Sequence, residues 1–166
     1  VYVVFNRVQG IDMVASKISS LVPEASVATG HGQMNEVQLE KVMLGFIEGK
    51  TNVLVATTII ESGLDISNVN TIIVLDADRF GLSQLHQLRG RVGRGKYQSY
   101  CIFVSGSDTA KAKDRLGILN QTNDGFKIAE EDLKQRGPGD FFGVRQSGDL
   151  RFKIGDIFSD SKVLKE

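Results

Sequence analysis

Residues 1–5, with the sequence VYVVF, form an unbroken apolar run. A run of this kind is typical of a strand that is buried on both faces, as strands of parallel sheets are. Short apolar runs recur at residues 52–56 and 71–75. The recurrence predicts a parallel sheet, and parallel strands need long crossover connections, which are usually helices.

The connecting segments carry helical periodicity. Apolar residues recur at three- and four-residue spacing over residues 11–21, and Pro23 ends that pattern. Asn35 is a candidate N-cap for a second helix that extends to Glu48. Strands and helices therefore alternate through residue 105, which is typical of an α/β fold. The other expected elements are strands over 26–29 and 99–104 and a helix over 83–92.

The pattern changes after residue 105. A helix is predicted over residues 109–121 with Asp108 as its N-cap, and a second helix over residues 126–135. A glycine-rich tail follows, beginning with Arg-Gly-Pro-Gly at 136–139. The expected fold class is α/β, with a parallel sheet flanked by helices and followed by a helical hairpin and an irregular C-terminal arm. We expect two units, residues 1–106 and residues 107–166.

The composition excludes several classes of protein. Lys and Arg total 20, as do Asp and Glu, so any contact with nucleic acid must come from local patches. Cys101 is the only cysteine, which excludes an intrachain disulfide and a four-cysteine metal site, and we expect no metal site in this chain. No apolar run approaches the roughly 20 residues that a membrane span needs, and we expect a cytoplasmic protein. Because the chain begins inside a strand and without Met, we expect a piece of a longer protein.

The strongest chemical signal is the arginine segment, residues 84–94, with the sequence QLHQLRGRVGR. Its three arginines alternate with two glycines, and helical spacing is expected to place Gln87, Arg91 and Arg94 on one face. The planar guanidinium suits phosphate oxygens, and glycine allows a close approach of the backbone. Binding of a phosphate is therefore favoured, although a solvated basic face or pairing with acidic residues would also use arginines.

Two further segments follow predicted strands, at the sheet edge where ligands of parallel sheets bind. Thr57 and Thr58 bring two hydroxyls that suit a phosphate, and Gly63 precedes Asp65 in an expected tight loop. The alternative is that the threonines cap a helix and that Asp65 satisfies a turn. Glycines flank His31 in the second segment, which indicates either a loop pressed against a partner or a simple turn.

Taken together, these segments resemble superfamily 2 helicases. Residues 87–94 are similar to motif VI, Q-x-x-G-R-x-G-R, residues 57–66 to motif V, and residues 31–34 to an H-G-x-M segment. The resemblance implies a RecA-like sheet whose Arg91 and Arg94 act as arginine fingers on ATP bound to a partner RecA-like domain. It also implies roles for the remaining positions: Gln87, Gly63 and Asp65 toward ATP, and His31, Thr57 and Thr58 toward DNA.

The tail narrows the resemblance. Residues 122–126, 136–139 and 145–148 are similar to the TRG region that RecG helicases share with the Mfd transcription-repair coupling translocase. In that family the hairpin and arm convert domain closure into movement along duplex DNA. The matching polar positions are Arg115, Arg136 and Gln146, although an arginine at a helix end can also simply complement the helix dipole.

The resemblance implies the second motor domain of an ATP-dependent DNA helicase that branch-migrates forks and Holliday junctions in recombination and repair. Its partners would be branched or duplex DNA and the first RecA-like domain of the same protein. ATP and Mg²⁺ would be bound mainly by that first domain, because this sequence has no Gly-x-x-x-x-Gly-Lys-Ser/Thr loop. We therefore expect no ATP hydrolysis by this chain alone. The alternatives are an Mfd-like translocase and a non-catalytic α/β binding module.

Overall fold

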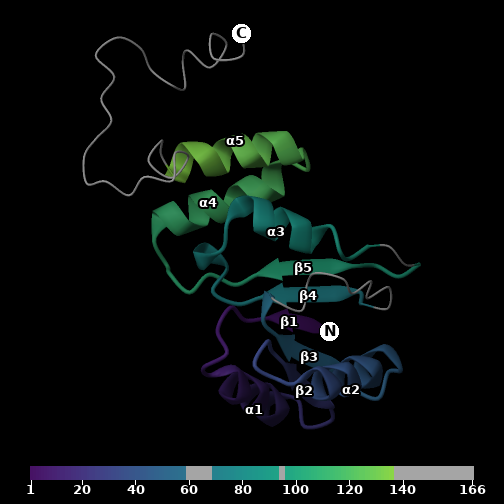
Figure 1. Ribbon diagram of the computed structural model, residues 1–166. Coiled ribbons are helices and arrows are strands. Elements are labelled where there is room, and N and C mark those ends of the chain that lie inside the picture. The colour runs from purple at the N-terminus through teal and green to yellow at the C-terminus, as the bar shows by residue number, and fades with distance from the viewer. Residues whose placement is uncertain (59–68, 94–95, 137–166) are drawn as a thin grey trace, which may run out of the picture.

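The computed structural model describes residues 1–58, 69–93 and 96–136 (Figure 1). Within these ranges, five strands form one sheet in the order β2-β3-β1-β4-β5, and every neighbouring pair is parallel. The apolar run at the start of the chain supplies the central strand, as its burial requires. The strands are β1 (Tyr2–Val4), β2 (Val27–Gly30), β3 (Val53–Ala56), β4 (Thr71–Val74) and β5 (Tyr100–Phe103).

Helices connect these strands and follow the last one. The Asn35 side chain accepts the Gln38 amide at 2.9 Å, while the Gln38 side chain accepts the Asn35 amide at 3.3 Å. This reciprocal pair is a capping box and confirms Asn35 as an N-cap. The helices are α1 (Ile11–Leu21), α2 (Glu36–Ile47), the short 3₁₀ helix η2 (Ala77–Arg79), α3 (Leu82–Arg89), α4 (Ala110–Gln121) and α5 (Gly125–Arg136).

The two faces of the sheet have separate cores. Val3 and Phe5 pack with Ile11 of α1 on one face. On the other face Val4 belongs to a larger cluster that includes Leu85 of α3 and extends to the last two helices. Neighbouring strand residues thus point to opposite buried faces, which explains the unbroken apolar run. The expected parallel sheet flanked by helices is confirmed.

The expected hairpin is also confirmed. Helices α4 and α5 are joined by residues 122–124 and lie against α3, at the β4–β5 end of the sheet (Figure 1). Leu119 of α4 and Ile128 of α5 are buried in the same cluster as α3. The hairpin therefore shares its core with the sheet. The predicted irregular arm, from residue 137 on, lies outside the described residues.

Two local predictions are wrong. Helix α3 ends at Arg89 rather than at residue 92, because Gly90 is its C-cap and Gly93 has a φ of 89°. Arg91 therefore does not share a helical face with Gln87, and Arg94 lies outside the described residues. The N-cap of α4 is Thr109 rather than the predicted Asp108. The Thr109 hydroxyl accepts a hydrogen bond from the Ala112 amide at 3.3 Å, three residues into the helix, which is the bond that defines an N-cap.

No helix in the described part of the chain is long and apolar enough to cross a membrane.

Candidate functional site

The carboxyl ends of the parallel strands gather polar side chains along one edge of the sheet. We call this the carboxyl edge, and open parallel sheets bind ligands there. It includes three residues that were predicted from the sequence, one after β2 and two after β3, and others that were not predicted. The residues that follow the strands are Asn6 and Arg7 after β1, His31 after β2, Thr57 and Thr58 after β3, and Asp76 after β4.

The structure brings His31 and Thr57 to neighbouring positions. The last paired residues of β2 and β3 are Gly30 and Ala56, and the Thr57 amide donates to the Gly30 carbonyl at 3.2 Å. Thr57 is only 4% exposed. Within the described residues, neither the Thr57 hydroxyl nor Nδ1 of His31 has a hydrogen-bond partner, although both atoms are buried. Such an atom costs about 1–3 kcal/mol, so its presence at a sheet edge needs an explanation.

Thr58 differs from Thr57 although the two are adjacent. Its hydroxyl donates to Oδ1 of Asn6 at 3.3 Å, which joins the segment after β3 to the loop after β1. The side chain is half-buried. Of the two hydroxyls predicted to bind phosphate, that of Thr58 therefore has a hydrogen-bond partner within the described residues and that of Thr57 has none.

A charge pair at the carboxyl edge was not foreseen in the sequence. Nη2 of Arg7 donates to Oδ2 of Asp76 at 2.7 Å, and the Arg7 guanidinium lies 5.2 Å from the ring centroid of Phe5. Asp76 has a φ of 50°, which few non-glycine residues adopt. A Cβ on Gly106 would lie 2.6 Å from the Asp76 carboxylate, so that position favours glycine. Arg7 and Asp76 both follow strands, and this position was the only feature of the sequence that could have predicted their place at the carboxyl edge.

Asp78 attaches the loop after β5 to η2. Its carboxylate accepts the Gly106 amide at 2.5 Å and the Ser105 hydroxyl at 3.3 Å. Desolvation raises the pKa of Asp78, but these hydrogen bonds, together with its own backbone amide and the charge of Arg79, outweigh it. The net pKa of Asp78 is therefore below its ordinary value, and the carboxylate remains charged at neutral pH.

The arginine segment is divided between two environments. Leu85 and Leu88 are fully buried, while Gln87 of the same helix is exposed. Arg91 is half-buried and follows the helix end, where its amide donates to the Leu88 carbonyl at 3.1 Å. Arg89 points toward the hairpin. Arg89 and Arg91 therefore do not lie together on one solvated basic face.

Arg115 is half-buried at the junction of the hairpin with the turn before α3. Its guanidinium donates to the Asp78 carbonyl at 3.1 Å and to the Phe80 carbonyl at 2.6 Å. It also pairs with Asp132 at 3.3 Å, and the two side chains are 17% and 8% exposed. Asp132 in turn accepts the amide of Leu82, the first residue of α3, at 3.1 Å. We call this set of contacts the hairpin joint.

Several predicted site residues cannot be placed in this geometry. Gly63, Asp65 and Gln146 lie outside the described residues, as does Arg94. Arg136 is the last residue of α5, but its side chain is not among those described. Nδ1 of His86 accepts a hydrogen bond from Nη2 of Arg89 at 2.9 Å, so this ring nitrogen is not free to bind a metal ion. Within the described ranges no cluster of three or more His, Cys, Asp or Glu could hold a metal ion.

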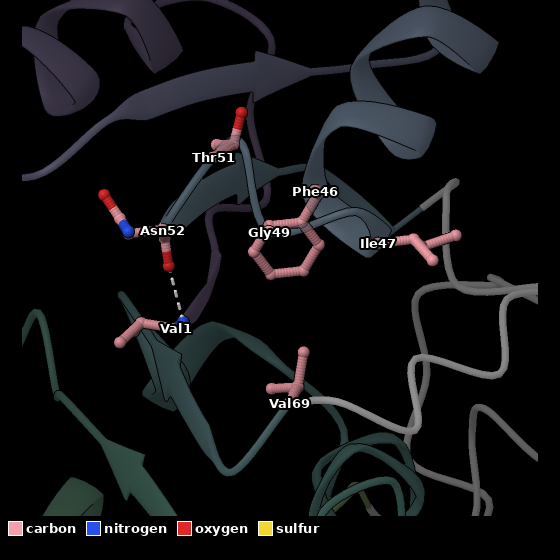
Figure 2. Close-up of a pocket in the computed structure, with 7 residues that line it drawn as sticks. All are labelled: Val1, Phe46, Ile47, Gly49, Thr51, Asn52 and Val69. Atoms are coloured by element: carbon pink, nitrogen blue, oxygen red, sulfur yellow. Dashed lines mark hydrogen bonds between the residues drawn. The ribbon is translucent and has the colours of Figure 1, made fainter.

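A pocket lies at the opposite edge of the sheet (Figure 2). It is lined by Phe46 and Ile47 at the end of α2, and by residues that precede β1, β3 and β4. Figure 2 shows the Val1 amine, which donates to the Asn52 carbonyl at 2.7 Å at one side of the pocket. Its lining combines apolar side chains with Thr51, Asn52 and the Val1 amine, but it lies at the amino ends of the strands, away from the edge at which parallel sheets bind ligands. The carboxyl edge is therefore the better candidate site.

Two family profiles match the chain. Residues 1–96 match the helicase conserved C-terminal domain. Residues 122–166 match the C-terminal part of domain 3 of ATP-dependent DNA helicase RecG. The first match covers β1–β4, α1–α3 and the arginine segment, and the second begins at the turn between α4 and α5.

Similar proteins of two kinds exist. ATP-dependent DNA helicase RecG of Streptococcus pneumoniae is 51% identical over 143 residues, which are 86% of this chain and 21% of that protein. The transcription-repair-coupling factor of Bacillus subtilis is 49% identical over 172 residues, covering 100% of this chain and 14% of that protein. The chain thus spans about a fifth or less of the length of these relatives. Both resemblances inferred from the sequence are confirmed.

A solved structure supports the same fold. The structure of RecG bound to a three-way DNA junction matches with a TM-score of 0.70 at 39% identity, over 99% of this chain and 22% of that chain. The match includes the hairpin as well as the sheet. The RecA-like helicase arrangement expected for the α/β fold is therefore confirmed.

Proposed function

The chain belongs to the helicase conserved C-terminal domain family, and we propose that it is the second RecA-like motor domain of an ATP-dependent DNA helicase of the RecG type. One observation carries this proposal. The hairpin packs directly on α3, the helix that contains the first part of the arginine segment, and the RecG profile begins at the turn of that hairpin. We further propose that residues 1–106 form the motor unit and residues 107–166 the hairpin and TRG-like arm.

The proposed substrate of the arginine segment is ATP held by a first RecA-like domain of the same protein. Arg91 and Arg94 would stabilise the charge that develops on the γ-phosphate, with Gln87, Gly63 and Asp65 facing the nucleotide. Guanidinium and amide donors fit a phosphate group. We propose that the first domain holds most of the ATP and Mg²⁺, because this sequence has no Gly-x-x-x-x-Gly-Lys-Ser/Thr loop.

The proposed DNA contact is the carboxyl edge, through His31, Thr57 and Thr58. The buried hydroxyl of Thr57 and Nδ1 of His31 support this role, because both lack a partner among the described residues. A phosphate oxygen accepts a hydroxyl hydrogen bond without any charged side chain, which suits a chain whose net charge is zero. The proposed DNA is branched or duplex, and the proposed outcome is branch migration in recombination and repair.

A second candidate is a transcription-repair coupling translocase. The 49% identity to the Bacillus subtilis factor over the whole chain favours it nearly as much as the sequence identity to RecG does. The RecG profile over residues 122–166 favours the first candidate. The two are distinguished by testing the longer protein for branch migration of a synthetic junction and for displacement of a stalled RNA polymerase.

Replacing Arg91 in the longer protein tests the proposed function. We expect R91A to lower the DNA-stimulated ATP hydrolysis rate by about 10³-fold, the lower range for loss of an arginine finger. Lys17→Ala, which removes an exposed charge on α1, should leave the rate unchanged. If R91A hydrolysed ATP at the rate of the unaltered protein, the motor function would be wrong and a non-catalytic binding module would be favoured.

A further inference from the structure

Arg89 is the first of the three arginines of the arginine segment. It is the last residue of α3, and only Gly90 separates it from Arg91. Its side chain is half-buried. A half-buried guanidinium needs several acceptors, and the neighbouring helix supplies them.

Arg89 binds the end of α4. Its Nη1 donates to the Leu119 carbonyl, and its Nη2 donates to the Thr122 carbonyl at 3.2 Å. Leu119 lies in the last turn of α4 and Thr122 is its C-cap, where carbonyls lose their helical partners. A positive charge at this position also complements the negative end of the helix dipole. Arg89 therefore caps α4 from a different helix.

His86 completes the contact with the turn of the hairpin. It lies one helical turn before Arg89, and its Nδ1 accepts Nη2 of Arg89 at 2.9 Å. Its other ring nitrogen would lie 3.2 Å from a Cβ on Gly125, the first residue of α5. Both ends of the turn thus lie close to α3: Arg89 binds the end of α4, and His86 leaves little room for a side chain at the start of α5.

The turn is internally ordered as well. The Asp124 amide donates to the Thr122 hydroxyl at 3.1 Å, and the Phe126 amide donates to the Asp124 carboxylate at 2.9 Å. At its far end, α3 is held by Asp132 of α5, which accepts the Leu82 amide at 3.1 Å. Leu119 and Ile128 fill the space between with buried apolar contact. Helix α3 is therefore fastened to the hairpin at both of its ends.

We propose that Arg89 is a positioning residue that transmits displacement of Arg91 to the turn between α4 and α5. Arg89 neither touches the nucleotide nor the DNA in this role. This positioning role rests on the proposed function, because Arg91 is displaced when it engages ATP. Its loss uncouples ATP hydrolysis from movement of DNA, since Arg91 stays intact while the end of α4 is released.

The test compares two activities of the longer protein with Arg89→Ala and Arg89→Lys. DNA-stimulated kcat and KM for ATP report on hydrolysis, and the unwinding rate of a synthetic three-way junction reports on movement. In R89A we expect kcat and KM to change by less than about threefold, while junctions unwound per ATP fall about tenfold, within the range of coupling residues. R89K keeps the positive charge but loses the two-armed guanidinium. Its number of junctions unwound per ATP should therefore lie between those of R89A and the unaltered protein. The control is Lys111→Ala, an exposed charge on α4.

Each outcome is decisive. An unchanged number of junctions unwound per ATP in R89A overturns the proposal, and so does an equal loss of hydrolysis and unwinding, which a merely structural role would give. If R89A does not fold, R89K decides, and a ratio equal to that of K111A overturns the proposal. If the unaltered protein shows no DNA-stimulated hydrolysis, the proposed function fails instead.

Discussion

Buried polar groups occur in two regions of this molecule and are treated differently in each. At the hairpin joint, Arg115 and Asp132 donate to or accept from backbone groups and from each other. At the carboxyl edge, the Thr57 hydroxyl and Nδ1 of His31 have no partner within the described residues. Partnered groups hold elements together, whereas an unpartnered group lowers stability and persists where a ligand uses it. The difference separates polar residues of the architecture from polar residues of the site.

The strongest way to break this comparison is to remove the arginine of the hairpin joint. Arg115→Ala leaves Asp132 buried without its ion-pair partner and two carbonyls without a donor. We expect the free energy of unfolding to fall by about 3 kcal/mol, as for other broken buried pairs. Urea unfolding followed by circular dichroism measures it.

The control for that change is Lys113→Ala, which removes an exposed ion pair with Asp108. It should cost less than about 1 kcal/mol. Equal effects of the two substitutions would contradict the structural role of the joint.

Substitutions of two glycines should have effects of intermediate size on stability. Gly106→Ala places a Cβ 2.6 Å from the Asp76 carboxylate, which Arg7 holds in place. We expect a loss of about 1 kcal/mol from overpacking. Gly117→Ala meets nothing within 4 Å in α4 and should stabilise by about 0.5–1 kcal/mol. The two melting temperatures should move in opposite directions, and a shift in the same direction would refute the close approach.

The smallest expected effect is at the carboxyl edge. Thr57→Val keeps the shape of the side chain and removes a hydroxyl that has no partner among the described residues. Stability should stay the same or rise by up to about 1 kcal/mol. Thr58→Val loses its hydrogen bond to Asn6 and should lower stability by a similar amount. Urea unfolding of the two variants side by side gives the sign, and a larger loss in T57V would show that its hydroxyl is structural.

Local sequence patterns were enough to predict the sheet. The apolar run at the N-terminus, the periodicity of α1 and the N-cap at Asn35 all depend on neighbours within a few residues. Positions after strands also identified His31 and Thr57, because the carboxyl edge of a parallel sheet is fixed by topology.

The roles of the arginines depended on contacts that no local pattern encodes. Arg115 reaches carbonyls 35 and 37 residues away, and Arg89 reaches carbonyls 30 and 33 residues away. Spacing within the arginine segment could therefore not separate Arg89 from Arg91. The end of α3 could not be predicted for a different reason, since Gly90 terminates the helix although Leu88 and Val92 continue the four-residue apolar spacing.

The affinity of the longer protein for a synthetic three-way DNA junction tests the central comparison most directly. A hydrogen bond to a charged phosphate is worth about 1.5–3 kcal/mol, so T57V should weaken binding about tenfold or more. Binding measured at one fixed salt concentration makes the values comparable. The account predicts this loss in T57V at an undiminished free energy of unfolding. An unchanged affinity in T57V would contradict it, because the unpartnered hydroxyl would then serve neither the fold nor the DNA.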